Sequence, residues 1–238
     1  MKFFDASKIW TCPDIFEVLS ENDYSQLKLQ DPDKRIRFRP VCTDRNGPAD
    51  VAFIAMNISC GDEYAKAKTK FNYFEWAQDL PEFFKFLKPV MEVYCQAASI
   101  VYKRPAVAYV TTLSKLVLPK NSYGASKGLQ VLATLKSSSA NEKFCSDAIL
   151  SEIDTLTSRG CKIFICFGAE CFNETASILS SQTSVEQMTG IDQLIKFEFN
   201  GKSCLLVRSP HYLAKQDVVT EGEFISGLIM RHGLGITA

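Results

Sequence analysis

The chain has 238 residues, of which 46% are hydrophobic and 23% charged, proportions that exclude a disordered or fibrous chain and allow a sizeable core. Lysine plus arginine and aspartate plus glutamate both number 27, so the formal net charge is zero. A neutral total leaves a nucleic-acid partner open, because a local basic patch is enough to bind phosphates.

The ends of the chain and its apolar runs predict a soluble intracellular protein, cytoplasmic or associated with the nucleoid or nucleus. Met1 to Lys8 lack the continuous apolar segment of a secretory signal peptide. No run approaches the roughly 20 apolar residues that span a bilayer. Because no repeat, low-complexity tract or linker divides the sequence, we expect one domain over residues 1–238, with residues 1–45 as a helical or irregular extension packed on it.

The nine cysteines contain no C-x-x-C pair. Zinc sites usually show such close pairs, and iron–sulfur clusters need four placed thiolates. Cys166 lies inside an apolar run and Cys204 beside another, where a reduced cysteine behaves as a small hydrophobic residue. We therefore predict ordinary reduced thiols, no metal and no cofactor.

The amino-terminal segment combines a possible helix over residues 13–29 with a basic stretch over residues 31–40. Lys34, Arg35 and the arginines that follow form either a phosphate-contacting edge or a solvated strand whose apolar residues turn inward. The same two interpretations, phosphate contact or exposed loop, apply to the lysines of residues 118–140.

An unbroken apolar run from Val51 to Met56 stops at Asn57 and passes into a polar, glycine-containing loop. Such a run bounded by turn residues predicts a buried strand of a parallel sheet. Ligands of open parallel sheets bind beyond the carboxyl ends of the strands, which makes Asn57 a candidate site residue. Alternatively, Asn57 only ends the strand and caps a turn.

The aromatic cluster of residues 71–76 also allows two interpretations. Its rings could stack on a nucleic-acid base, an interaction of roughly 1–3 kcal/mol per base. They could equally form the buried face of a helical stretch that resumes after Pro81.

Three further apolar runs predict strands, and amphipathic segments between them predict helices. The expected strands are residues 105–112, 161–168 and 203–211, and the expected helices are residues 76–102 (interrupted at Pro81 and Pro89), 141–159 and 169–180. Alternating strands and helices are typical of a parallel sheet covered on both faces. The fold class is therefore predicted as α/β, a three-layer α/β/α sandwich with a central, mainly parallel four-stranded sheet.

Polar residues end three of the expected strands, at Asn57, Thr112 and His211. No G-x-S-x-G motif, P-loop or dinucleotide fingerprint occurs, so the usual signals of acyl transfer, nucleotide hydrolysis and hydride transfer are missing. Of the two histidines, His211 follows a strand and a proline, whereas His232 lies near the end of the chain. A single histidine at such a place is either structural or catalytic.

The order of these motifs resembles the uracil-DNA glycosylase superfamily over about residues 45–215. Residues 47–57 resemble the family's first strand and water-activating motif, and residues 109–115 resemble the second strand, which in many members reads Y-[IV]-T-N-x-x-K. Residues 144–170 resemble a helix followed by the third strand. Residues 205–213 resemble the last strand, which in active members carries a His-Pro-Ser type motif.

The resemblance implies a monomeric protein that rotates a base out of DNA and hydrolyses its glycosidic bond. Asn57 would position the attacking water and His211 would donate to the base carbonyl. Met56, Phe71 and Thr112 would contact the flipped base. The residues implied to lie near the DNA strand are Lys115, Leu213 and Lys215.

Several positions depart from the family pattern. Ile58 follows the water-activating residue where many members have proline, and Tyr212 follows His211 in place of proline. Thr112 replaces an asparagine that reads the pyrimidine edge, and a hydroxyl cannot make that bidentate contact. An asparagine is no general base, and neither Asp62 nor Glu63 occupies the expected place of a carboxylate.

Three hypotheses follow. The first is a DNA glycosylase acting on uracil or a related deaminated or damaged base. The second is a weak or inactive relative that binds nucleic acid or a protein through the same groove. The third is an unrelated small-molecule hydrolase, because a fold does not determine function.

Overall fold

The computed structural model describes residues 49–56, 88–113, 139–187, 193–210 and 218–232. The elements are β1 (Val51–Ala55), α5 (Lys88–Tyr102), β2 (Ala108–Thr112), α7 (Ser139–Ser158), β3 (Ile163–Phe167), α8 (Ala169–Ser180), β4 (Val185–Gln187), β5 (Leu194–Phe199), β6 (Lys202–Ser209) and α9 (Val218–His232). All four predicted strands are present. The amino-terminal extension predicted over residues 1–45 lies outside the described residues.

The strands form one sheet in the order β2-β1-β3-β6-β5-β4. β2, β1, β3 and β6 are mutually parallel, whereas β5 and β4 are antiparallel to their neighbours. The prediction of four strands is therefore wrong, since the part of the sheet that the structure describes is mixed and has six strands. The hairpin between β5 and β6 turns at Asn200 and Gly201, whose positive φ angles of 51° and 68° suit a tight two-residue turn.

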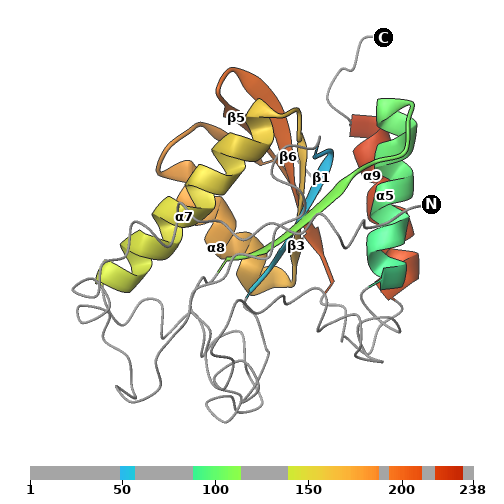
Figure 1. Ribbon diagram of the computed structural model, residues 1–238. Coiled ribbons are helices and arrows are strands. Elements are labelled where there is room, and N and C mark those ends of the chain that lie inside the picture. The colour runs from blue at the N-terminus through green and yellow to red at the C-terminus, as the bar shows by residue number, and fades with distance from the viewer. Residues whose placement is uncertain (1–48, 57–87, 114–138, 188–192, 211–217, 233–238) are drawn as a thin grey trace, which may run out of the picture.

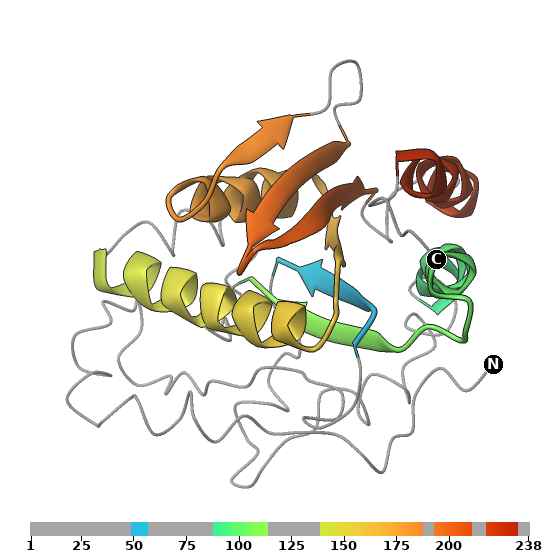
Figure 2. The same cartoon turned by 90° about the horizontal axis from the view of Figure 1, so that it is seen from above.

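Helices cover both faces of the sheet, as predicted. α7 and α8 lie on one face, and α5 and α9 pack side by side on the other (Figures 1 and 2). Side chains of β1 alternate between the two: Ile54 joins the cluster with Ile149 of α7, while Phe53 contacts the ring of Tyr94 on α5. Burial on both faces explains why β1 is apolar throughout.

The helix boundaries agree closely with the pattern for α7 and α8, and α5 ends at Tyr102 as predicted. Residues 76–87 of the predicted helix lie outside the described residues, and Pro89 is the second residue of α5. A proline is tolerated there because first-turn N–H groups have no partner within the helix. α9, which the pattern did not predict, completes the α5 face of the sheet. No described helix is long and apolar enough to cross a membrane.

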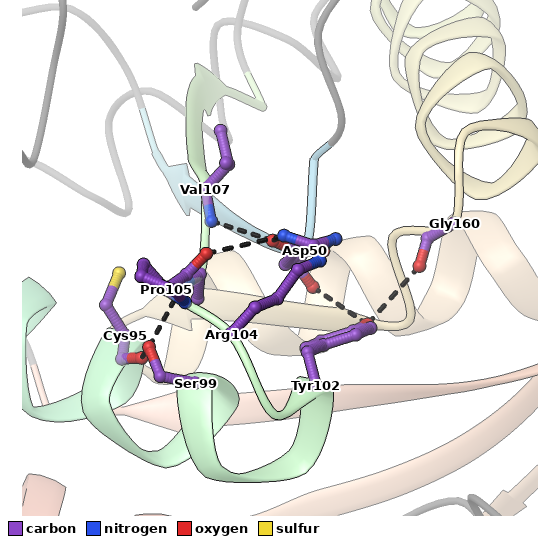
Figure 3. A network of polar contacts seen from close by, with 9 residues as sticks. Asp50, Cys95, Ser99, Tyr102, Arg104, Pro105, Val107 and Gly160 are labelled. Carbon is purple, nitrogen blue, oxygen red and sulfur yellow. Dashed lines mark hydrogen bonds and ion pairs between the residues drawn. The ribbon is translucent and has the colours of Figure 1, made fainter. Parts of the chain in front are cut away.

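An ion pair between the buried Asp50 carboxylate and the partly exposed Arg104 guanidinium ties together three chain segments at the amino ends of the strands (Figure 3). The Asp50 carboxylate, in a residue only 1% exposed, accepts two bonds from the Arg104 guanidinium at 2.8 and 2.7 Å. It also accepts the Val107 N–H at 2.8 Å. The Tyr102 hydroxyl lies 3.2 Å from the Asp50 carbonyl and 3.3 Å from that of Gly160. These contacts join the start of β1 to the segments that precede β2 and β3.

The Arg104→Ala variant should lower the free energy of unfolding by about 2 kcal/mol or more, because it leaves a buried carboxylate without its counter-charge. Urea denaturation measures the change. The matched control is Lys143→Ala, which breaks an exposed pair with Asp147 and should cost less than about 0.5 kcal/mol. Equal, small effects of both variants would contradict the role given to Asp50.

Candidate functional site

The four parallel strands end side by side at one edge of the sheet. Thr112 is the register partner of Ala55, and the N–H of Leu113 donates to the Ala55 carbonyl at 2.8 Å. Ser209 is the partner of Phe167 at the end of β3, and the N–H of Gly168 donates to the Ser209 carbonyl at 2.8 Å. We call this the carboxyl edge, and it is where ligands of open parallel sheets bind.

Two of the predicted site residues lie at the carboxyl edge. Met56 follows β1 and is buried, with 9% of its surface exposed. Thr112 is the last residue of β2, on the neighbouring strand. The other predicted site residues lie outside the described residues: Asn57, Phe71, Lys115, His211, Leu213 and Lys215. In sequence, Asn57 comes one residue after Met56 and His211 two residues after the end of β6.

Two helices border the carboxyl edge. α8 begins directly after Gly168, so the partial positive charge of its amino terminus lies there. α7 has 20 residues, which span about 28 Å, whereas the five residues of β3 span about 13 Å. Because the carboxyl end of α7 leads into β3, its amino-terminal half extends past the carboxyl edge (Figure 2).

On the face of the sheet that α5 covers, aromatic rings and hydroxyls lie next to the carboxyl edge. The Phe53 ring stacks on Phe167 at 5.8 Å between centroids and meets Tyr94 edge-on at 6.1 Å. Burial raises the pKa of the Tyr94 phenol, an effect opposed by the nearby Ser209 hydroxyl and reinforced by Glu221. Although close, neither hydroxyl makes a hydrogen bond of ordinary geometry to any residue that the structure describes.

A buried carboxylate lies on the opposite face. Glu152 of α7 is 6% exposed and accepts a hydrogen bond from the Thr111 hydroxyl at 2.8 Å, one position before the end of β2. Asp62 and Glu63, the acidic residues considered from the sequence, lie outside the described residues, and Glu152 was not predicted. The available signal was an acidic residue between Ile149 and Ile153 on the apolar side of a predicted helix.

The described cysteines form no metal site. Among the described residues no three His, Cys, Asp or Glu side chains are grouped to hold a metal ion. The six described cysteines are free and buried. Burial raises the pKa of Cys95 to about 12 and that of Cys204 to about 11, and it also raises the pKa of Cys161 and Cys171. These thiols are therefore neutral at physiological pH.

Comparisons with known proteins assign no family. No family model matches the sequence, and no curated protein matches it. Among solved structures, the chain is similar to a crystal structure from Salmonella typhimurium LT2 that is provisionally described as a tRNA synthase, with 11% identity and a TM-score of 0.24. The alignment covers 76% of this chain and 42% of that chain. A likeness at this TM-score carries no argument about fold or function.

The turn between β3 and α8 should tolerate only glycine. Gly168 has φ 90° and ψ 158°, a combination that side-chain-bearing residues adopt at a cost of about 1–3 kcal/mol. We expect Gly168→Ala to lower the free energy of unfolding by about that amount in urea. The control is Gly201→Asn, because asparagine accepts the φ of 68° and a Cβ there meets nothing within 4 Å. Unchanged stability of Gly168→Ala would contradict the turn geometry.

The raised thiol pKa values predict slow labelling. At pH 8, N-ethylmaleimide should leave Cys95, Cys161, Cys171 and Cys204 unmodified in the folded protein and modify all four in urea. Raising the pH toward 11 increases the thiolate fraction of Cys204, whose pKa is the lower of the two given above. Peptide mass spectrometry locates the labels. Fast labelling of Cys161 or Cys204 in the folded protein at pH 8 would contradict their burial.

Proposed function

We propose that this protein is a DNA glycosylase of the uracil-DNA glycosylase type, which excises a deaminated or damaged base during DNA repair. One observation carries the proposal. The four segments that resemble the family's strands correspond to β1, β2, β3 and β6, the four mutually parallel strands of the sheet. Motifs separated by up to about 150 positions in the resemblance therefore follow strand ends at one edge.

The spacing of those strand ends suits a nucleoside. Only β3 lies between β1 and β6, so the two ends are about two strand spacings, or 10 Å, apart. Asn57 follows one end and His211 the other. A sugar held between them would have a water-orienting amide on one side and a hydrogen-bond donor for its base on the other. The amino terminus of α8, which follows the intervening β3, favours negative charge.

In the proposed reaction, Asn57 and His211 have separate roles. As the glycosidic bond breaks, positive charge develops on the sugar and negative charge on the departing base. In the proposal, the Asn57 amide orients the water and His211 stabilises the base oxygen. Because an amide does not accept the proton as a carboxylate does, we expect slow turnover or a preference for bases that leave easily.

The remaining predicted site residues form the binding surface in this proposal. Phe71 stacks on the flipped base, and Met56 and Thr112 line the proposed pocket. The Thr112 hydroxyl makes a single contact where an asparagine makes two, which favours acceptance of several deaminated bases. Lys115, Leu213 and Lys215 contact the DNA strand in this proposal.

The second candidate function is a relative that binds nucleic acid or a protein without excising bases. The absence of a carboxylate at position 57 and the Tyr212 after His211 favour it. It uses the same edge of the sheet, so the two candidates differ in chemistry and not in location.

Oligonucleotides carrying uracil, hypoxanthine or xanthine, single- and double-stranded, test the proposal. Incubation followed by cleavage at abasic sites should reveal product on at least one substrate. Asn57→Ala and His211→Ala should each lower the single-turnover rate by about a hundredfold or more. His232→Ala is the matched control, because it removes the other histidine of the chain and should leave the rate unchanged.

The outcomes separate the hypotheses. No abasic product together with salt-sensitive DNA binding would exclude the glycosylase and favour the binding relative. Neither product nor DNA binding would exclude both nucleic-acid hypotheses. Full activity of both the Asn57 and the His211 variants would contradict the site assignment.

A further inference from the structure

Three turns meet at the edge of the sheet where the parallel strands begin, which we call the amino edge. The hydroxyl of Tyr102, the last residue of α5, lies 3.3 Å from the Gly160 carbonyl, so the turn after α5 lies beside the turn after α7 (Figure 3). The Lys202 ammonium donates to the Thr157 and Ser158 carbonyls at 2.7 and 3.2 Å, so β6 begins at the same place. The proposed reaction uses none of these turns.

The turns after α5 and α7 carry more positive than negative charge. Their basic residues are Lys103, Arg104, Arg159 and Lys162. Lys103, Arg159 and Lys162 make no ion pair with any residue that the structure describes. The buried acid at these turns is Asp50, and Arg104 neutralises it. The carboxyl ends of the two helices contribute about half a negative charge each, which offsets about one of the unpaired cations.

Two further acidic residues of the amino edge lie at the hairpin between β5 and β6. Asp154 accepts a hydrogen bond from Asn200 in the hairpin turn, and Glu198 comes two residues before that turn residue. Lys202 lies on the same hairpin and balances part of their charge. The positive surplus therefore belongs to the turns after α5 and α7, in a chain whose net charge is zero.

Two exposed apolar side chains lie beside the basic turn after α5. Ile100 is 65% exposed and Val107 is 36% exposed. The Lys103 N–H donates to the Ile100 carbonyl at 3.3 Å. The Ala106 N–H donates to the Ser99 hydroxyl at 2.9 Å, so the residues that follow them, Val107 and Ile100, lie near each other. Positive charge and exposed apolar surface therefore occur together at the amino edge.

This combination fits an acidic peptide better than a nucleic acid. Phosphates bind to cations alone, and unpaired bases need an exposed ring on which to stack. The Tyr102 ring at this edge is covered by the Arg104 guanidinium, 5.6 Å from the ring centroid. In a peptide, carboxylates pair with the basic side chains while aliphatic side chains contact Ile100 and Val107.

We propose that the amino edge is a docking surface for an acidic segment of a partner protein that also carries aliphatic side chains. Lys103 and Arg159 bind its carboxylates, and Ile100 and Val107 contact its apolar side chains. The amino edge lies opposite the carboxyl edge, so this partner and a ligand of the proposed site bind without competing. The inference does not depend on the proposed function.

A short fluorescein-labelled peptide of glutamate and leucine tests the surface by fluorescence anisotropy. Two comparison peptides replace its glutamates with glutamine or its leucines with serine. The glutamate–leucine peptide should bind about tenfold more tightly than either, because each comparison peptide loses one of the two kinds of contact. Its affinity should fall as the salt concentration rises. No binding of the glutamate–leucine peptide would overturn the inference.

Two variants of the protein remove the basic side chains. Arg159→Glu should weaken peptide binding by about tenfold or more. Lys103→Asn removes a charge, and asparagine accepts the φ of 53° at this position, so it should weaken binding without lowering the melting temperature. The matched control is Lys143→Glu, which makes the same charge change near the amino end of α7 and should leave the affinity unchanged. Equal losses in Arg159→Glu and Lys143→Glu would overturn the inference, because they would show a response to net charge alone.

Backbone amide shifts of the ¹⁵N-labelled protein locate the bound peptide. The peptide should shift Val107 and Gly160 and leave Leu113 and Gly168 at the carboxyl edge unchanged. Shifts confined to the carboxyl edge would overturn the inference. A single-stranded oligonucleotide that shifts Val107 and Gly160 and displaces the peptide would overturn it in favour of a nucleic acid at this edge.

Discussion

The parallel pairing of β1 with β2 and β3 is the constraint on which the rest of the structure depends. β1 is hydrogen-bonded to a strand on each side and buried on both faces. Its pairing register with β2 and β3 is therefore strongly constrained. Parallel neighbours necessarily end at the same edge. The Asp50 ion pair fixes the opposite edge, where the strands begin. The residues with proposed roles in the reaction follow the strand ends at the other edge.

Much of the fold can be predicted from the hydrophobic pattern of the sequence. Strands buried on both faces require continuous apolar runs, and helices that cover a sheet require amphipathic segments. β1, β3 and α8 carry these patterns plainly. β5 was missed, although the alternation of residues 194–199 before Asn200 and Gly201 is a hairpin signal. α9 was missed for another reason: glycines at positions 222 and 227 lower its helix propensity, and packing against α5 stabilises the helix instead.

The site was predictable only where it consists of strand ends. The sequence predicts Met56 and Thr112 at the ends of neighbouring strands, and the register pairs Thr112 with Ala55, the residue before Met56. Their contacts with a base stay predictions. It did not identify Tyr94 or Glu152, which come from helices. Which helical residue reaches a strand end depends on how the helix is rotated and shifted against the sheet, and this is a property of tertiary packing that spacing along the chain does not contain.

The most direct test of the proposed function is to determine whether DNA binds, and at which edge of the sheet. An oligonucleotide with a tetrahydrofuran abasic-site analogue is titrated into the ¹⁵N-labelled protein, and backbone amide shifts are recorded. The account predicts shifts at Leu113, Gly168 and Ser209 on the carboxyl edge, and none at Val107 or Gly160 on the opposite edge. Shifts confined to Val107 and Gly160, or no shifts at all, would contradict it.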